Sequence, residues 1–584
     1  MCGIVGEVSA RGPIDRQAFD RRRDLLHHRG PDDADTWMSP DAAVALGNRR
    51  LSLCDPSDAG RQPMANEDGS VQVTFNGEIY NFRALRRQLE GRGHRFRSRC
   101  DTEILAHGWE EWGEGLLERL EGMYAFALWD RRRNGLLLAR DRFGIKPLYY
   151  FRGEGRFAFA SEPRALVAHP EIPRQVDLSA LCDFLVYRFV PSPKCIFRGL
   201  AKLPPAHALF CELESGEVRT WRHWRPSREE NGVEDVGARF EELFADAVVS
   251  HTAADAPLGS LLSGGMDSSA LAAMTARRNG EYPTFSIGFS HWQDSEHSDA
   301  AAVAAAFGLP NHRWLLGLES LALVERLAEV FDEPVADIST LPTLAVAALA
   351  ANRVKGVLSG EGADELFGGY AWHHRLAAAA APVADLVSFY GEAMAMGSFA
   401  EGELERLIHP DRRDALPADP LWFYRSCLEE VDEATTLDRS LAGLQWLDLR
   451  SFMGELVLTK VDRATMAASL EARVPFLDHR LFDFVYALPR QTVYRAGRQK
   501  PLLAEFLAGK IPRRILERPK QGFVGPDHYY RLDRRRLAAL GDARLVRDGV
   551  FSAAGLRTMV ETGGPWRRWK LLVLELWYRR WMAS

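Results

Sequence analysis

The chain of 584 residues carries 74 lysines and arginines against 80 aspartates and glutamates, a net charge of −6. So small an imbalance argues against a nucleic-acid-binding protein that works through bulk charge. With 46% hydrophobic and 26% charged residues, the composition is ordinary for a folded protein and excludes disorder along the whole chain. The length suggests two large domains or about four of ordinary size. The longest uncharged stretch, Ile338 to Asn352, is too short and too polar to span a bilayer.

The beginning of the chain and its cysteines indicate the compartment. The segment from Met1 to Gly6 has neither the basic region nor the long apolar region of a secretory signal. The 7 cysteines are scattered, odd in number and form no CxxC pair, which argues against a disulfide framework and a structural zinc site. We therefore expect a reducing, cytoplasmic location.

The first 210 residues read as a mixed domain built around sheets. Short apolar or alternating runs bounded by Gly, Asn or Asp predict strands, and longer periodic runs predict helices. The predicted strands are Ile4–Val8, Val71–Phe75, Tyr124–Trp129, Leu136–Ala139 and Phe157–Ala160. The predicted helices include Phe82–Leu89 and Thr102–Trp112. Residues 211–235 are polar and are interpreted as a linker, which Trp221 and Trp224 hold against a surface.

From residue 236 to residue 584 the chain reads as a second domain, in which strands and helices first alternate. The predicted strands are Leu258–Leu262, Thr284–Phe289 and Arg353–Leu358, and the predicted helices are Ser268–Arg278, Ser298–Phe307 and Thr343–Asn352. This alternation predicts a parallel, doubly wound α/β sheet. Beyond residue 370 the pattern is mostly helical. The basic, aromatic segment Trp566–Trp581 is apolar all round, which favours a packed closing helix over a membrane-surface helix.

Cys2 is a candidate nucleophile. Removal of Met1, which is favoured before a small residue, would leave an α-amine with a pKa of ~7.7–8.0 as general base for the thiol of the same residue. A thiolate that attacks an amide needs donors for the oxyanion. Asn76 and Gly77 follow a predicted strand and offer a side-chain and a backbone N–H group. Taken alone, Cys2 is a small apolar residue and Asn-Gly a turn signal.

Six strings in the first domain occur in one order, each in a strand or loop context. They are Cys2–Gly6, His28–Asp32, Arg50–Ser52, Asn76–Asn81, Asp101–Glu103 and Arg140–Tyr149. Together they resemble the glutaminase domain of class II glutamine amidotransferases, which are N-terminal nucleophile hydrolases. The resemblance implies an αββα sandwich in which Cys2 attacks the side-chain amide of glutamine and releases ammonia. Asn76 and Gly77 would form the oxyanion hole.

The same resemblance implies the glutamine-binding residues. Arg50 would clamp the α-carboxylate with its planar fork, although the adjacent Arg49 leaves an ambiguity of one residue. Asp101 and the region of Glu78 would hold the α-ammonium group, and Asn76 would also contact the substrate.

The segment Leu258–Ala270 reads as a strand, a loop rich in Ser and Gly, and the start of a helix. Glycines let the backbone approach a phosphate closely, hydroxyls donate to it, and the helix start is partly positive. The groups concerned are Gly264, Gly265, Ser263, Ser268 and Ser269. The loop is no Walker A motif, because no Gly-Lys-Ser/Thr follows. By itself it is a strand–helix turn.

Three further strings accompany this loop, namely Ser359–Tyr370, Asp462–Ala467 with Glu471–Asp478, and Pro519–Phe523. With the loop they resemble the ATP pyrophosphatase domain of the asparagine synthetase family, in which ATP is cleaved between the α- and β-phosphates. Met266 stands where that family usually has Leu, a mild change. The resemblance thus covers nearly the whole chain.

This second resemblance implies ATP and Mg²⁺. Asp267 and Asp364 would be the metal ligands, as hard oxygen donors. Glu361 would position or deprotonate ammonia, and Lys520 would neutralise charge that develops on the reacting oxygens. The implied ATP-binding residues are Leu261, Ser263, Gly264, Gly265, Asp267, Ser268, Ser269, Ile287, Ser359 and Gly360. Taken singly, Lys520 reads as a solvated surface lysine and Glu361 as a helix N-terminal acid.

The expected function is the glutamine-dependent, ATP-dependent amidation of a carboxylate, with aspartate as the first expected acceptor. Ammonia would travel uncharged along a sheltered path between the domains. The expected partners are small-molecule substrates, namely glutamine, ATP and aspartate or another carboxylate. We expect no nucleic acid and no membrane as partner, and the chain could form a homodimer.

Two alternatives remain. Relatives amidate peptides, natural products and sugar acids, and Glu7 and Trp292 depart from the pattern of a housekeeping asparagine synthetase. Formation of a β-lactam ring is disfavoured, because the relative that catalyses it lacks the nucleophilic cysteine. A binding protein with both sites decayed is the other class, and the presence of the candidate site residues argues against it.

Overall fold

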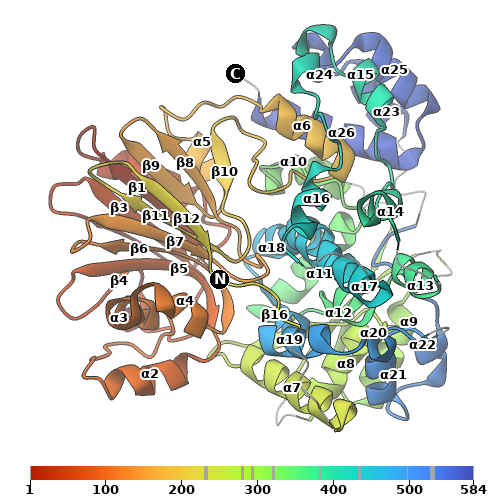
Figure 1. Ribbon diagram of the computed structural model, residues 1–584, viewed down its shortest axis with the longest axis horizontal. Helices are drawn as coiled ribbons and strands as arrows, with labels where there is room; N and C mark the ends of the chain where they lie inside the picture. Colours follow the sequence, from red (N-terminus) through yellow and green to blue (C-terminus); the bar gives the residue numbers. More distant parts are fainter. Residues whose placement is uncertain are drawn as a thin grey trace.

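The computed structural model describes residues 2–228, 234–277, 282–290, 292, 295–317, 322–379, 383–431, 436–495, 498–526 and 533–582. The chain forms one half built on two antiparallel sheets and another built on a parallel sheet with many helices (Figure 1). The first half lies at the left of the figure and the second at the right.

The first half contains two sheets of six strands. The first has the order β10-β8-β9-β1-β3-β2 and the second β12-β11-β7-β6-β5-β4. The strands of the first sheet are β1 (Gly3–Ser9), β2 (Asp33–Met38), β3 (Val44–Arg50), β8 (Tyr149–Gly153), β9 (Arg156–Ala160) and β10 (Leu200–Lys202). Those of the second are β4 (Met64–Ala65), β5 (Val71–Ile79), β6 (Gly122–Asp130), β7 (Gly135–Arg140), β11 (His207–Glu212) and β12 (Val218–Arg222).

Alternation along β1 explains how these sheets pack. Ile4 and Val8 point into an apolar core shared with the second sheet, whereas Val5 points to the outer face and packs in a core with Phe19 of a helix. The helices are α1 (Arg16–Asp24), α2 (Phe82–Glu90), α3 (Glu103–Trp112), α4 (Leu116–Arg119), α5 (Pro163–Val167) and α6 (Leu178–Tyr187). Helices α1 and α5 cover the first sheet, and α2 and α3 cover the second. The predicted αββα sandwich is confirmed.

The region interpreted as a linker differs in the structure. Residues 218–222 form β12, which pairs with β11 in antiparallel register and makes the edge of the second sheet. The polar sequence reflects that edge position, because an edge strand keeps solvent on one side. Trp224, just beyond β12, packs edge-on against Phe143 and Phe482, in agreement with the expected surface contact.

The second half contains a parallel sheet of five strands in the order β15-β14-β13-β16-β17. Its strands are β13 (Leu258–Leu261), β14 (Thr284–Phe289), β15 (Asn311–Leu316), β16 (Gly356–Leu358) and β17 (Glu471–Arg473). The predicted doubly wound sheet is confirmed. The chain builds the sheet from β13 outward to β14 and β15, and then adds β16 on the other side of β13. In such sheets, ligands bind beyond the carboxyl ends of the strands at the point where the strand order reverses.

The helices begin with those that cross over the parallel sheet, namely α7 (Val236–His251), α8 (Met266–Thr275), α9 (His297–Ala306), α10 (Leu323–Val330), α11 (Thr340–Ala351) and α12 (Ala363–Phe367). The next group is α13 (Ala371–Ala377), α14 (Leu386–Ala393), α15 (Glu401–Leu407), α16 (Trp422–Leu428), α17 (Leu437–Leu447), α18 (Leu458–Met466), α19 (His479–Ala487) and α20 (Arg490–Val493). The last group is α21 (Pro501–Leu507), α22 (Arg513–Glu517), α23 (Arg534–Gly541), α24 (Arg544–Arg547), α25 (Ala553–Thr562) and α26 (Pro565–Trp581).

Helix α26 closes the molecule. It packs against α10, α23, α24 and α25, and its Trp569 and Trp577 are buried. The indole N–H of Trp577 donates to the carbonyl oxygen of Asp332 at 2.9 Å. The prediction of a packed closing helix is thus confirmed.

Candidate functional site

The first candidate site lies where strands of the two facing sheets meet. The backbone N–H of Cys2, before β1, donates to Oδ1 of Asn76 on β5 at 2.9 Å. The Nδ2 atom of Asn76 is buried and has no hydrogen-bond acceptor among the described residues. At Gly77 a Cβ atom would lie 2.0 Å from the carbonyl oxygen of Met123, so the position requires glycine. The structure therefore brings together the three residues predicted for nucleophile and oxyanion hole.

The thiol of Cys2 is only 6% exposed. Burial raises its pKa above the ordinary value, and the nearby charge of Arg50 opposes this rise in part. A thiol in this state needs a base before it can attack an amide.

The two neighbouring arginines have different surroundings in the structure. Arg50 is buried, and its Nη2 atom donates to the carbonyl oxygens of Cys54 at 2.9 Å and Asp55 at 2.6 Å. Arg49 points to the other face of β3, where its Nε donates to the carbonyl oxygen of Gly30 at 3.0 Å. The positive charge of Arg50 acts on the Cys2 thiol, so Arg50 lies beside this candidate site. Its guanidinium is fixed by backbone carbonyls.

Two buried carboxylates complete the first site. Glu78 lies 3.0 Å from Nη2 of Arg473, and Oδ2 of Asp101 accepts the backbone N–H of Ile79 at 2.8 Å. Burial raises the pKa of both carboxyl groups, and each also feels the negative charge of Glu471. A cationic group that entered here would meet an excess of carboxylates.

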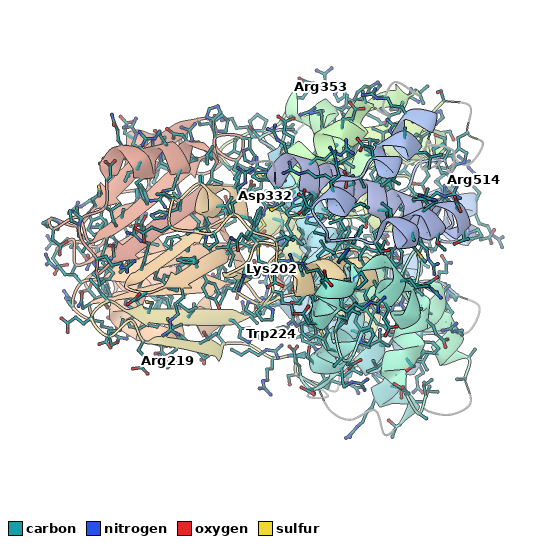
Figure 2. The ribbon with its side chains drawn as sticks, turned by 90° about the horizontal axis from the view of Figure 1, so that it is seen from above. Lys202, Arg219, Trp224, Asp332, Arg353 and Arg514 are labelled. Carbon is teal, nitrogen blue, oxygen red and sulfur yellow. The ribbon has the colours of Figure 1, made fainter. Side chains whose placement is uncertain are left out.

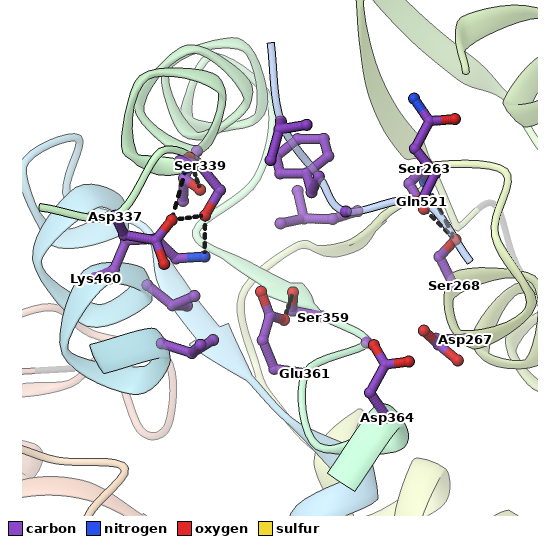
Figure 3. Close-up of a pocket in the computed structure, with 18 of the residues that line it drawn as sticks. Ser263, Asp267, Ser268, Asp337, Ser339, Ser359, Glu361, Asp364, Lys460 and Gln521 are labelled. Atoms are coloured by element: carbon purple, nitrogen blue, oxygen red, sulfur yellow. Dashed lines mark hydrogen bonds between the residues drawn. The ribbon is translucent and has the colours of Figure 1, made fainter. Parts of the chain in front are cut away.

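The second candidate site begins at the carboxyl end of β13. The hydroxyl groups of Ser263 and Ser268 lie 3.1 Å apart, and the Ser268 oxygen accepts the backbone N–H of Ser263 at 3.1 Å (Figure 3). Gly264 has a φ of +86°, and a Cβ there would lie 2.6 Å from the backbone nitrogen of Ala300. The loop therefore keeps the tight turn into α8 that its two glycines predict.

The loop borders a cavity of about 310 Å³ at the end of the parallel sheet. The predicted residues that line it are Leu261, Ser263, Asp267, Ser268, Ile287, Ser359, Gly360, Glu361, Asp364 and Lys520. Gly264, Gly265 and Ser269 do not line it. The hydroxyl of Ser269 instead donates to the carbonyl oxygen of Gly265 at 2.7 Å and braces the loop from behind.

Two lysines separate the two predicted metal ligands. Asp364 forms ion pairs with Lys520 and with Lys500, whose Nζ lies 2.6 Å from Oδ1, and Asp267 also pairs with Lys500. Although burial opposes ionisation, the lysines hold the pKa of Asp364 well below its usual range, and the aspartates raise the pKa of Lys520. Asp267 and Asp364 fit a hard divalent cation, since they offer carboxylate oxygens at the edge of a cavity that the hydroxyl groups of Ser263 and Ser268 also line.

Lys500 was not predicted from the sequence. It is 2% exposed and has a φ of +42° just before Pro501, which begins α21. At Gly369 a Cβ would lie 2.4 Å from Cε of Lys500, so the glycine makes room for the lysine. A lysine before a helix-starting proline is the only local signal, and it does not specify a site.

The opposite wall of the cavity holds a second group that the sequence did not single out. Nζ of Lys460 donates to Oγ of Ser339 at 2.8 Å, and the backbone N–H of Ser339 donates to Asp337 at 2.6 Å (Figure 3). Glu361 lies between this group and Asp364, and the hydroxyl of Ser359 donates to it. Apolar residues also line the cavity, namely Phe452, Met453, Val457, Val461 and Phe523.

One strand connects the two candidate sites. Arg473 of β17 pairs with Glu78 through its guanidinium, and its carbonyl oxygen accepts the backbone N–H of Ser359 at 2.8 Å. Arg473 is fully buried. The first site and the cavity are therefore joined by a single residue of the parallel sheet.

Glu7, one of the two departures from the family pattern, lies away from the cavity. It is buried on β1 and forms ion pairs with Arg22 and Arg156. It is thus an internal charge of the first half and does not line the cavity. Trp292, the other departure, packs against Phe289 with ring centroids 5.6 Å apart; its neighbours 291, 293 and 294 lie outside the described residues.

Comparison with known proteins agrees with this layout. Residues 1–224 match the family model of the glutamine amidotransferase domain, and residues 239–579 match that of asparagine synthase. The chain is 33% identical over 563 residues to asparagine synthetase [glutamine-hydrolyzing] 3 of Bacillus subtilis, covering 90% of this chain and 88% of that protein. The chain belongs to the asparagine synthase family. Its chemistry is accordingly glutamine-dependent, ATP-using amidation.

Two further relatives show the breadth of this family. Asparagine synthetase [glutamine-hydrolyzing] 1 of Bacillus subtilis is 31% identical over 99% of this chain and 96% of its own length. Amidase chry2 of Gibberella zeae is 26% identical over 91% of this chain and 90% of its own length. Within the described part of this asparagine synthase-family chain, no helix is long and apolar enough to cross a membrane.

Proposed function

We propose that this protein hydrolyses glutamine at Cys2 and uses the ammonia to amidate an acyl-adenylate in the cavity beyond β13. The observation that carries the proposal is the link through Arg473, whose side chain contacts the first site and whose backbone contacts Ser359 in the second. The second cavity argues against a plain glutaminase. The presence of both groups of candidate site residues argues against a binding protein with decayed sites.

In the first site, removal of Met1 would leave the α-amine of Cys2 beside Oδ1 of Asn76. This amine would take the thiol proton, and sulfur would attack the glutamine amide carbon. Nδ2 of Asn76 and the N–H of Gly77 would stabilise the oxyanion. The C–N bond breaks, the ammonia leaves with the proton, and water then cleaves the thioester to glutamate.

The surroundings of Cys2 would orient glutamine. Arg50 would bind the α-carboxylate, and its carbonyl partners would fix the fork before the substrate arrives. Glu78 and Asp101 would accept hydrogen bonds from the α-ammonium group, which would offset part of the cost of burying two carboxylates.

In the second site, an acceptor carboxylate would attack the α-phosphorus of ATP and release pyrophosphate. Ammonia would then attack the acyl carbon, and AMP would leave. Ser263 and Ser268 would hold phosphate oxygens, and Lys520 would neutralise the developing charge. Glu361 would accept a proton from the attacking ammonia. Mg²⁺, held by Asp267 and Asp364, would shield the phosphate charge.

Aspartate is the first proposed acceptor, and the relatives that carry the name asparagine synthetase support it. Lys460 on the far wall would meet its α-carboxylate and Asp337 its α-ammonium group. The apolar lining of the cavity, around Phe452 and Val461, favours a second candidate, a larger carboxylate with an apolar part. The similarity to amidase chry2 is compatible with this alternative.

The test measures pyrophosphate release from ATP across a panel of carboxylates, with glutamine or ammonia as nitrogen source. Cys2→Ala should abolish amidation driven by glutamine and retain amidation driven by ammonia. Loss of both activities would contradict a two-site enzyme. Mass spectrometry should find a mature chain that begins at Cys2, and a retained Met1 would remove the proposed base. Pyrophosphate release with larger carboxylates but not with aspartate would select the second candidate.

A further inference from the structure

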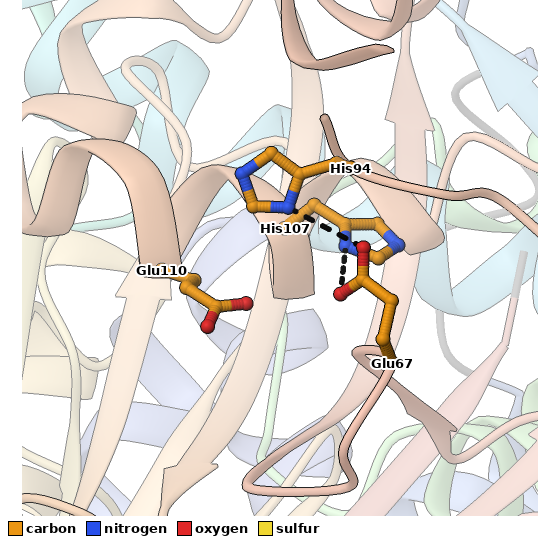
Figure 4. Close-up of side chains that lie close together, drawn as sticks. All are labelled: Glu67, His94, His107 and Glu110. Carbon is orange, nitrogen blue, oxygen red and sulfur yellow. Dashed lines mark ion pairs between the residues drawn. The ribbon is translucent and has the colours of Figure 1, made fainter. Parts of the chain in front are cut away.

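A group of four side chains outside both candidate sites has the composition of a metal centre. Glu67, His94, His107 and Glu110 place one potential ligand atom each within 4.8 Å of one another (Figure 4). None of them lines the cavity or contacts Cys2. They come from three segments, namely the turn between β4 and β5, the loop after α2, and α3.

The two imidazoles face the same carboxylate. Nδ1 of His107 lies 3.2 Å from Oε2 of Glu67, and Nδ1 of His94 lies 3.6 Å from Oε1. In a tetrahedral site with metal–ligand bonds of ~2.0–2.1 Å, neighbouring ligand atoms lie ~3.3 Å apart. The two separations from Glu67 bracket this value, and because all four ligand atoms lie within 4.8 Å of one another, a short inward movement of the side chains would bring them around one ion.

The outer contacts of both histidines point to the same arrangement. Nε2 of His107 lies 3.4 Å from Glu103, and Nε2 of His94 lies 3.4 Å from Glu111. Each ring therefore has an outer carboxylate to accept an Nε2 proton, which leaves the Nδ1 lone pair directed at Glu67. Metal-binding histidines are typically held in this way, by a second carboxylate that fixes the tautomer.

The Nδ1 atom of His107 is an independent indication of a bound ligand. His107 is 0% exposed, and its Nδ1 has no partner with hydrogen-bond geometry, although Glu67 is near. A buried, unsatisfied nitrogen is costly unless something binds it. Both oxygens of Glu110 accept a hydrogen bond, Oε2 from Asn66 at 3.0 Å and Oε1 from Arg132 at 2.8 Å, so the carboxylate is held in place and would bind an ion through a remaining lone pair.

We propose that Glu67, His94, His107 and Glu110 bind one divalent transition-metal ion of the Zn²⁺ type. Two imidazoles with two carboxylates suit such an ion, whereas Mg²⁺ prefers an octahedron of oxygens. The ion would fasten the loop after α2 to α3. That loop includes Asp101 of the first site, and Glu103 already binds its backbone through the N–H groups of Arg97 and Ser98 at 2.8 Å.

The test titrates the full-length protein with Co²⁺ and follows the visible d–d absorption. We expect one Co²⁺ per chain in a nitrogen and oxygen environment, without the charge-transfer bands of thiolate ligands, displaced by Zn²⁺ and not by Mg²⁺. Zn²⁺ should raise the melting temperature. A Cys2→Ala background removes the reactive thiol as a competing ligand.

Matched variants separate a metal site from a cluster of charges. Glu111→Gln, which alters an outer carboxylate, should weaken binding by ~10–100-fold, and His94→Gln and Glu110→Gln by at least as much. Glu114→Gln is the control, since Glu114 lies exposed just beyond the end of α3 and forms an ion pair with Arg219, away from the four proposed ligands. Circular dichroism without metal checks that each variant folds. Absent stoichiometric binding, or equal binding in all variants, would mean that these side chains form a cluster of hydrogen bonds and ion pairs without a metal, and would overturn the proposal.

Discussion

Glutamine hydrolysis should depend directly on the side-chain amide of Asn76. Its oxygen is committed to the Cys2 backbone, while its nitrogen is buried without an acceptor. Asn76→Ala should therefore lower the kcat of glutamine hydrolysis by ~10²–10³-fold. Amidation driven by ammonia should be unchanged, and it serves as the control in the same preparation. Equal loss of both activities would mean that Asn76 supports the fold and gives no oxyanion donor.

Substitution of Lys500 or Lys520 should impair synthesis, whereas substitution of a lysine outside the cavity should not. Either Lys500→Met or Lys520→Ala leaves Asp364 with one cation, so synthesis should be lost or strongly reduced while glutamine hydrolysis continues. Lys510→Met is the control, because Lys510 stacks on Phe506 and does not line the cavity. Parallel assays of glutamate and pyrophosphate measure the two activities. Normal synthesis in Lys520→Ala would remove this lysine from the site.

His251 should make stability depend on pH. Burial lowers its pKa to about 4, and the ring lies against Tyr80 with centroids 4.0 Å apart and the planes tilted by 34°. Between pH ~6.5 and 4 the unfolded chain binds a proton at this residue that the folded chain does not, so about 3 kcal/mol of stability is present above pH ~6.5 and is lost as the pH falls toward 4. His251→Gln should flatten the fall in melting temperature over this window. An unchanged slope would assign the acid sensitivity to other groups.

At this scale, local sequence predicts part of each site. Cys2 directly precedes β1, which its own pattern predicts, whereas Asn76 and Gly77 lie within β5, which continues to Ile79 beyond the predicted strand end at Phe75. Lys500 could not be predicted, since it reaches Asp267 across 233 positions of the chain through the packing of α21. A contact of that kind depends on tertiary structure and leaves no local periodicity.

Among the elements, β17 is short and fully buried. Its three residues pair with β16 and carry both Glu471 and Arg473. Three residues give too few repeats to predict a strand, whereas β14 is predicted with its observed bounds because six apolar-rich residues stand between turn signals. β12 was missed for the opposite reason, since an edge strand is polar enough to resemble a linker.

Arg473→Lys should loosen the link through β17. Lysine keeps the charge but lacks the fork that reaches Glu78, Glu471 and the carbonyl oxygens of His251 and Ala253 together. We expect a higher KM for glutamine and more glutamate formed than amide product. The control is Arg480→Lys, whose guanidinium pairs with Asp478 at a partly exposed position. Unchanged stoichiometry in Arg473→Lys would mean that the two sites communicate by another route.

For the whole molecule, the two halves are held together by buried ions. Arg29 contacts Asp462 and Glu162 at 2.8 Å, and Arg463 contacts Glu162 at 2.6 Å and Asp332 at 3.1 Å. Figure 2 shows Asp332 and Lys202 at the junction of the halves. Each of the five charged groups of this network is less than 5% exposed. Buried pairs of this kind contribute little net stability but fix one geometry, because a lone partner is costly.

This network should make the orientation of the halves sensitive to single substitutions. Asp462→Ala leaves Arg29 without one of its two carboxylates and should lower the free energy of unfolding by ~3–5 kcal/mol. Glu517→Ala is the matched control, since it breaks an exposed pair with Arg513 that is worth less than ~1 kcal/mol. Urea unfolding followed by tryptophan fluorescence measures both. A second test compares glutamate with amide product, because a displaced interface should let ammonia escape even in molecules that remain folded. If Asp462→Ala matched the control in stability and in stoichiometry, the interface would be held by its apolar contacts, and the buried ions would have no part in joining the two sites.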